Sequence, residues 1–253
     1  MSRISINGFV IRGFSMGESS RVISLFTREH GKLKAVAKGV KKTAIKKGGA
    51  LELFCHIQGM VYLKENVELG TIGSIELVDS YAHVADNPSS FGFASAFCEI
   101  LDKLTTIDQP VEGLFELTED FFRQMTAHGP ESSAILFWAA FIKMLTILGY
   151  QPHLFECVVC GRKNENKAAY YDSQKGGIIC SKDILEHVEY GKLSASSLAI
   201  LRKSLTSPLS EIAEIEPANK NLAEIEDFII SFAVYHTGLR RDLKSFKFLA
   251  QLK

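Results

Sequence analysis

Hydrophobic and polar positions alternate over short runs in the first part of the chain, and turn residues separate the runs. Such runs lie at residues 4–14, 22–26, 33–37, 51–63 and 69–78. Asn7-Gly8, inside the first run, indicates a bulge. Five short strands in about 80 residues fit a small closed barrel. Either an OB-type barrel, whose open face commonly binds single-stranded nucleic acid, or an SH3-like barrel meets this description.

After Asn87-Pro88 the hydrophobic residues recur at spacings of three and four, the period of an amphipathic helix. This period covers residues 91–104, 114–122, 194–205 and 219–232, and a basic amphipathic segment, 236–252, follows. Residues 135–148 are apolar nearly all round. Because this segment is too short to cross a membrane and contains Lys143, it predicts a central buried helix.

A glycine-containing segment with three cysteines interrupts the helical part. The complete pattern predicts an α+β fold with three parts. An N-terminal five-stranded OB-type β-barrel occupies residues 1–80, and an all-helical domain occupies residues 81–253. A zinc-ribbon-like module is inserted into the helical domain at residues 153–190.

Composition excludes a disordered, collagenous or low-complexity chain, since 46% of the 253 residues are hydrophobic, 23% are charged and only 6 are proline. The amino-terminal residues lack a signal sequence, so we expect a cytoplasmic protein with no membrane partner. Five cysteines, an odd number, favour reduced thiols or metal ligands over a disulfide framework.

The net charge of zero conceals a segregation of charge. Residues 1–80 carry 12 Lys and Arg against 7 Asp and Glu, whereas the rest of the chain carries 17 against 22. Seven lysines and no acidic residue lie within residues 31–47. Such a segment favours a polyanion as partner, although a solvated loop has the same composition.

Cys157-Val-Val-Cys160-Gly161 places two thiolates at the spacing that lets both reach one tetrahedral ion, and Cys180 begins a second such turn. The fourth position of that turn is Asp183. Zinc held by Cys157, Cys160, Cys180 and Asp183 is one interpretation, with His187 or His153 as substitutes for Asp183. A module that folds without metal and a redox pair at Cys157 and Cys160 are the alternatives.

No motif for catalysis is present. The chain lacks a G-x-S-x-G elbow, a G-x-x-x-x-G-K-[ST] loop and an H-E-x-x-H helix, so the sequence predicts no enzyme and no catalytic residue. Five barrel aromatics either stack nucleic-acid bases or fill the barrel: Phe9, Phe14, Phe26, Phe54 and Tyr62. Arginines and lysines of the barrel are candidates for phosphate contact, since charged residues are rarely buried.

Residues 17–21 (GESSR) and 25–39 (LFTREHGKLKAVAKG) resemble the amino-terminal signature of the RecO family of bacterial recombination and DNA repair proteins. The similarity continues through the lysine-rich loop, the helical domain, both cysteine turns and residues 243–249, so it covers essentially the whole chain.

This resemblance implies an OB-fold barrel, a helical domain with a zinc-ribbon-like module, and a non-enzymatic role in the RecF pathway. It implies binding to single- and double-stranded DNA, annealing of complementary strands, and action with RecR to load RecA onto DNA coated by single-strand-binding protein, at the nucleoid during repair. By position it implies DNA contact by Lys34 and Lys38, with neighbours at Arg12, Arg21, Lys41 and Lys42. Asp183 departs from the family pattern, which has a fourth cysteine there.

A second hypothesis assigns the function to the helical domain. The basic residues 240–247, beside Leu243, Phe246 and Leu249, would receive an acidic peptide tail with a hydrophobic end, which the resemblance suggests for single-strand-binding protein. In that case the chain is a protein-interaction scaffold that also binds RecR, and DNA contact is secondary.

Overall fold

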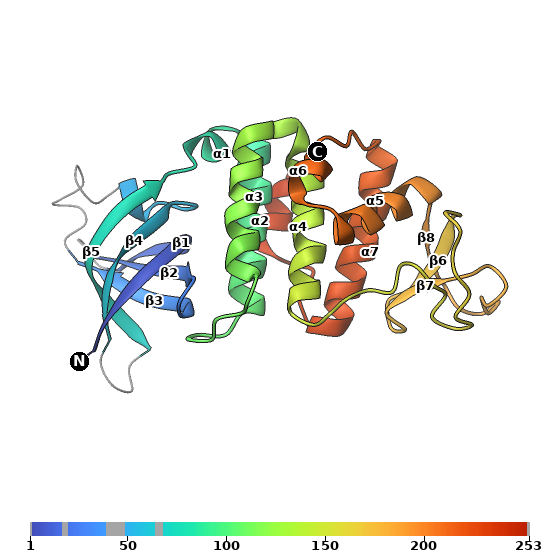
Figure 1. Cartoon of the computed structure of the whole chain (residues 1–253), viewed down its shortest axis with the longest axis horizontal. Helices are drawn as coiled ribbons and strands as arrows, with labels where there is room; N and C mark the ends of the chain where they lie inside the picture. The colour runs from blue at the N-terminus through green and yellow to red at the C-terminus, as the bar shows by residue number, and fades with distance from the viewer. Residues whose placement is uncertain (1, 17–19, 39–48, 64–67, 252–253) are drawn as a thin grey trace.

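The structure is a computed structural model, and it describes residues 2–16, 20–38, 49–63 and 68–251. A small β-barrel lies at one end of an elongated molecule, a helical bundle forms the middle, and a small β-containing module lies at the other end (Figure 1). The predicted α+β architecture, with five strands followed by helices and an inserted cysteine module, is confirmed.

The barrel consists of β1 (Ser2–Met16), β2 (Ser20–Thr27), β3 (Gly31–Ala37), β4 (His56–Leu63) and β5 (Leu69–Asp79). The sheet closes in the order β1-β2-β3-β5-β4, because β1 pairs with both β2 and β4. The β3–β5 pairing is parallel and the other pairings are antiparallel. Alternate side chains, among them Val10, Ile23, Leu25 and Leu33, fill a barrel core of their own.

Two local expectations in the barrel are wrong. The fourth strand begins at His56 and not at residue 51, because Phe54 has φ 75° and the backbone of residues 54–55 turns to bond Val10. The irregularity in β1 lies between Val10 and Arg12 and not at Asn7-Gly8. Gly8 instead permits close packing, since a Cβ there would lie 2.8 Å from the carbonyl oxygen of Phe26.

The bundle contains α1 (Ala82–Asp86), α2 (Pro88–Leu104), α3 (Leu114–His128), α4 (Ser133–Ile147), α5 (Ala195–Thr206), α6 (Leu209–Ala213), α7 (Asn219–Thr237) and α8 (Lys244–Gln251). The apolar helix α4 is central, as predicted, and contacts α2, α3, α5, α6 and α7. By length and composition, Pro130–Ile147 is the one stretch of the described chain that resembles a membrane span. It is 61% buried within the protein, which is typical of a core helix.

The cysteine module lies between α4 and α5. Its sheet has the order β7-β6-β8, formed by β6 (Ala169–Asp172), β7 (Gly177–Ile179) and β8 (Gly191–Leu193). Its buried residues, such as Tyr171 and Ile178, belong to the same hydrophobic cluster as the bundle. The module therefore has no core independent of the bundle among the residues described.

Aromatic rings join the barrel to the bundle. Phe9 of β1 is fully buried, and its ring stacks on His56 and on Phe122 of α3, with centroid distances of 4.5 and 5.4 Å. Burial lowers the pKa of His56, whose Nε2 lies 2.6 Å from Asn7 Oδ1. The imidazole therefore acts as a neutral part of this junction.

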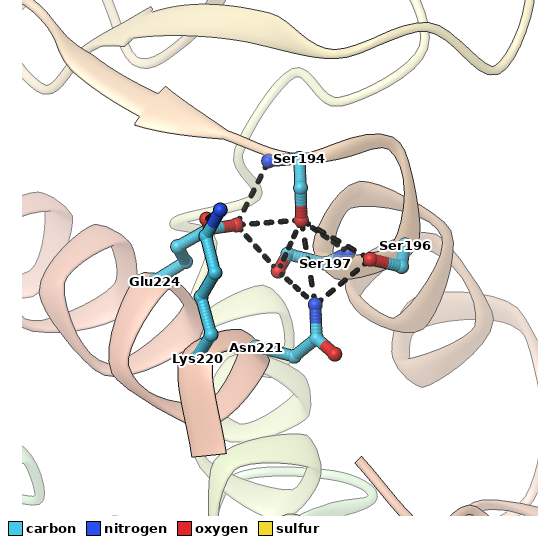
Figure 2. Close-up of polar contacts among 6 residues, drawn as sticks. All are labelled: Ser194, Ser196, Ser197, Lys220, Asn221 and Glu224. Carbon is cyan, nitrogen blue, oxygen red and sulfur yellow. Dashed lines mark hydrogen bonds and ion pairs between the residues drawn. The ribbon is translucent and has the colours of Figure 1, made fainter. Parts of the chain in front are cut away.

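Hydrogen bonds join the bundle to the module. The buried Arg202 of α5 donates to the carbonyl oxygens of Leu154 and Asn164. Figure 2 shows a second connection, in which the Glu224 carboxylate of α7 accepts three hydrogen bonds where β8 leads into α5. The donors are the Ser194 backbone N–H and the hydroxyls of Ser194 and Ser197, at 2.6–2.8 Å. A carboxylate thus fixes the chain at its exit from the module.

Candidate nucleic-acid interface and metal centre

Several cations of the barrel face the bundle or a neighbouring loop and are paired there. Arg12 lies 3.3 Å from Asp102 of α2, and Arg21 lies 2.7 Å from Glu52. Arg28 pairs with Glu116 and Glu119 of α3, and its guanidinium lies over the Phe115 ring. Lys32 is buried and pairs with Asp102. Part of the positive charge of the barrel is therefore neutralised within the chain.

Lys34 and Lys38 differ from these cations. On β3 the neighbours of Lys34, Leu33 and Ala35, point into the barrel core, so alternation places Lys34 on the outer surface. Lys34 is half-buried, and Lys38, just past the end of β3, is exposed. Neither ammonium forms an ion pair with a residue in the described part of the chain. Two further candidates, Lys41 and Lys42, lie outside the described residues.

The five candidate aromatics separate clearly by exposure. Phe9, Phe26 and Phe54 are at most 1% exposed, so they serve as packing residues. Tyr62 is half-buried, whereas Phe14 is 53% exposed. The bulge between Val10 and Arg12 explains this position, because strict alternation would have placed Phe14 inside the barrel with Val10.

The three cysteines and the aspartate predicted as metal ligands converge. The Sγ atoms of Cys157, Cys160 and Cys180 and a carboxylate oxygen of Asp183 all lie within 4.8 Å of one another. Gly161, with φ 71°, closes the first turn, where its N–H donates to the Cys157 carbonyl oxygen. In the second turn the Asp183 N–H donates to the Cys180 carbonyl oxygen. Neither His153 nor His187 is part of this group as the structure describes it.

The separation of two of the sulfurs matches a tetrahedral zinc site. Two sulfurs that each bind zinc at about 2.3 Å are separated by about 3.8 Å in a tetrahedron, and the Cys160 and Cys180 Sγ atoms are 3.7 Å apart. Asp183 Oδ2 lies 3.2 Å from Cys157 Sγ and 2.6 Å from Cys180 Sγ. Three thiolates and one carboxylate form a donor set that suits zinc.

Charges around the cysteine group also favour a cation within it. Hydrogen bonds from the thiols of Cys160, Cys180 and Cys157 lower the pKa of Asp183 to about 2, so this carboxylate is ionised at neutral pH. The Arg162 guanidinium donates to Cys160 Sγ at 3.1 Å and to Cys180 Sγ at 3.5 Å. It thereby offsets part of the negative charge that three thiolates and Asp183 would carry around a divalent ion.

Sequence reasoning missed the pairing of the barrel cations and the carboxylate that holds the module. Asp102 lies 90 residues from Arg12, and Glu224 lies 30 residues from Ser194. No local pattern connects such partners. The one available signal was Ser194 itself, since a serine just before a helical segment is typical of an N-cap, and here it accepts from the Ser197 N–H.

The fold defines a class of protein: an OB-type barrel carried by a helical domain with a ribbon-like cysteine module. Residues 1–81 match the family described as recombination protein O, N terminal, and residues 86–245 match recombination protein O, C terminal. The chain therefore belongs to the RecO family, and the resemblance seen in its sequence is confirmed.

Relatives named DNA repair protein RecO match between 70% and 99% of the chain in three examples. The protein of Pelotomaculum thermopropionicum is 29% identical over 249 residues, which cover 98% of this chain and 94% of the relative. That of Bacillus pumilus is 28% identical over 250 residues, or 99% and 94%. That of Bifidobacterium adolescentis is 32% identical over 179 residues, or 70% and 72%. These matches assign the chain to a family of DNA repair and recombination proteins.

Proposed function

We propose that the chain is a DNA-binding recombination mediator of the RecF pathway with no chemical step on a substrate. It would anneal complementary strands and, with RecR, assist RecA loading on DNA coated by single-strand-binding protein. The family supports a role in repair, and the finer role is our inference. Because the relatives are bacterial DNA repair proteins, we place this function in the cytoplasm, at the nucleoid during repair.

The observation that carries the proposal is the position of Lys34 and Lys38. Lys34 lies on the outer surface of β3 and Lys38 just past its end, and no described carboxylate pairs with either, while other cations of the barrel are already paired. An ammonium with no carboxylate partner is available for phosphate, which supplies affinity without sequence preference. Arg12 and Arg21 would contribute less to DNA binding, because they form ion pairs with Asp102 and Glu52. We assign Lys41 and Lys42 to the same DNA-binding surface.

Annealing requires little more than this charge. A basic surface reduces the repulsion between two strands and holds unpaired bases near each other, so no nucleotide site is needed. We propose that residues 1–80 bind DNA. Residues 81–253, with the module at residues 153–190, would place this DNA-binding barrel next to other repair proteins.

We further propose that Cys157, Cys160, Cys180 and Asp183 hold a structural zinc ion. When bound, the ion would cross-link the two turns of the module and contribute folding free energy. The protein groups would hold these ligands in place: Gly161 closes one turn, and Arg162 offsets charge. This role requires no open coordination position and no reaction at the metal.

Binding of a fluorescent single-stranded oligonucleotide across salt concentrations tests the function. For single strands, log K falls with log salt by about 0.7 per phosphate contact. The double substitution Lys34→Ala and Lys38→Ala should weaken binding and reduce this slope by about 1.4. Replacement of the exposed module residues Lys163 and Lys167 by alanine is the matched control and should leave the slope unchanged. An affinity that does not change with salt concentration, or that does not change when Lys34 and Lys38 are replaced, contradicts the proposal.

One observation favours the scaffold as a second candidate function. A cavity of about 520 Å³ opens between α2, α4, α7 and α8, and Trp138, Phe246, Leu249 and Arg241 line it. It offers an apolar floor beside a guanidinium, which an acidic tail with a hydrophobic end would require, and the carboxylates of Glu226 and Asp227 line it as well. Leu243, by contrast, is buried in the bundle core. A chain that captured such a tail and RecR but never bound DNA would favour this reading over the first.

A further inference from the structure

Phe14 lies on an apolar part of the outer barrel surface that has no covering element among the described residues. Its side chain is 53% exposed and makes no ring contact within the described chain. Met16, two residues further on β1, is 45% exposed, and Leu69 at the start of β5 is 39% exposed. A single exposed apolar residue needs no explanation, but Phe14 and Met16 lie together on β1, and Leu69 lies across β2 and β3 on β5. This grouping on the outer surface indicates a contact surface.

The strand register places these residues on the same part of the barrel as Lys34. Phe14 lies opposite Val22 of β2, which lies opposite Val36 of β3. One step along the strands, a parallel row runs from Arg12 through Ser24 and Lys34 to Leu69. Because adjacent strands are about 4.8 Å apart, the strand that carries Phe14 lies about 10 Å from the strand that carries Lys34. An aromatic ring and an ammonium group therefore share one face of the barrel.

We propose that Phe14 stacks on an unpaired base of the DNA strand whose phosphates Lys34 and Lys38 bind, so that Phe14 selects single-stranded over duplex DNA. The inference rests on the proposed function and deepens it. The argument for this occupant is charge complementarity: the surface beside Phe14 carries ammonium groups that no described carboxylate neutralises. A protein partner on the same face is the competing occupant that the test distinguishes.

Stacking explains strand selection because of what each form of DNA exposes. In a duplex the faces of the bases are already stacked on each other, so an external ring meets only the backbone. An unpaired base presents a free π-face, whatever its sequence. Loss of one base–aromatic stack lowers affinity by roughly 5- to 150-fold. The lysines, in contrast, bind phosphate in both forms.

The experiment uses the full-length chain and three fluorescent probes of equal length in anisotropy titrations. The probes are an oligothymidine, a strand of the same backbone without bases, and a duplex. The wild type should bind the oligothymidine more tightly than the strand without bases. Phe14→Ala should lose 5- to 150-fold in affinity for the oligothymidine alone and keep its salt slope, whereas the lysine double variant should weaken all three.

Two further variants separate stacking from a structural role. Phe14→Trp should restore oligothymidine binding, and its indole fluorescence should be quenched by the bound bases over the background of the buried Trp138. Tyr235→Ala removes an aromatic ring of similar exposure, 55%, from α7 and should change nothing. Equal loss for all three probes in Phe14→Ala would mean that Phe14 supports the barrel, and would overturn the proposal.

Two other outcomes would overturn base stacking by Phe14 and leave the proposed DNA-binding function intact. If the wild type binds the strand without bases as tightly as oligothymidine, or if Phe14→Ala binds oligothymidine normally, stacking is wrong and phosphate binding by the lysines stands. If the wild type binds none of the three probes, DNA binding fails as well, and a protein becomes the occupant of this surface.

Discussion

The two ends of the molecule are joined to the same bundle in different ways. The barrel has a hydrophobic core of its own and meets the bundle through buried rings around Phe9. The module shares the core of the bundle, and the bundle holds it through polar side chains such as Arg202 and Glu224. A barrel with a hydrophobic core of its own can keep part of its surface for a ligand. A module without such a core would gain stability from an internal cross-link such as the proposed metal ion.

The same difference shows in how each end uses charge. In the barrel, Arg12, Arg28 and Lys32 pair with carboxylates of α2 and α3. Among the residues that the structure describes, cations turned away from the bundle, such as Lys34, stay available. In the module, Arg162 lies against its own cysteines, and positive charge there compensates the proposed metal ligands. Basic residues at the two ends therefore have different roles despite similar chemistry.

Removing a metal ligand should give the largest effect and should leave the barrel untouched. Structural zinc contributes roughly 10 kcal/mol of folding free energy in small zinc modules. Cys157→Ser should lose zinc, measured by elemental analysis of the purified protein, and expose residues 153–193 to limited proteolysis. DNA affinity should stay near that of the wild type. Asp183→Cys supplies four sulfurs and is the matched control, which should retain the ion.

Two results together would favour a module that folds without metal. The wild type would contain no zinc, and Cys157→Ser would be as resistant to protease as the wild type. Rapid alkylation of Cys157 or Cys160 at neutral pH in the wild type would instead favour the redox interpretation.

Phe9→Ala should give the next largest effect, at the opposite end. Removing a fully buried phenylalanine costs about 3–5 kcal/mol, and Phe9 connects the barrel to α3. Trp138, the one tryptophan of the chain, lies in the bundle and reports unfolding of that part alone. In Phe9→Ala the barrel and the bundle should no longer unfold together. The urea transition measured by far-ultraviolet circular dichroism should therefore differ from the transition measured by Trp138 fluorescence.

Val10→Ala is the control for this prediction. Val10 is the next residue of β1, equally buried, but it faces the barrel core. It should destabilise the barrel without removing the junction. If Phe9→Ala and Val10→Ala separate the two transitions to the same extent, the junction does not depend on Phe9.

Local patterns predicted most of the fold, because strand alternation and helical period depend on neighbouring residues. The cysteine group was predictable for the same reason: Cys157 and Cys160 have the spacing of a metal turn, and the second turn repeats the pattern around Cys180. The partner of each charged residue was not predictable. Whether Arg12 meets DNA or Asp102 depends on how β1 packs on α2, which no spacing in the sequence encodes.

Phe9 and Phe14 show most clearly which part of the structure the sequence pattern could not predict. They are five residues apart on one strand, so regular alternation assigns them to opposite faces of the sheet. The bulge between Val10 and Arg12 puts both on the outer surface, one against the bundle and one in the open. Since the predicted bulge at Asn7-Gly8 was misplaced, the sequence could not identify Phe14 as the exposed ring.

The smallest effect should come from the carboxylate at the exit of the module. Burial raises the pKa of Glu224, but hydrogen bonds from Ser197 and Ser194 outweigh it and hold the pKa below its ordinary value of about 4.3. A carboxyl whose pKa is lower in the folded state stabilises fully above its unfolded pKa, and this stabilisation is lost as pH falls through the folded pKa. Glu224→Gln should therefore cost about 1–2 kcal/mol at pH 7, and the difference from the wild type should shrink below about pH 4. Urea unfolding at both pH values measures it, with the exposed Glu216→Gln as control. A difference that is independent of pH would assign the lost stability to packing and not to the charge that the two serines hold in place.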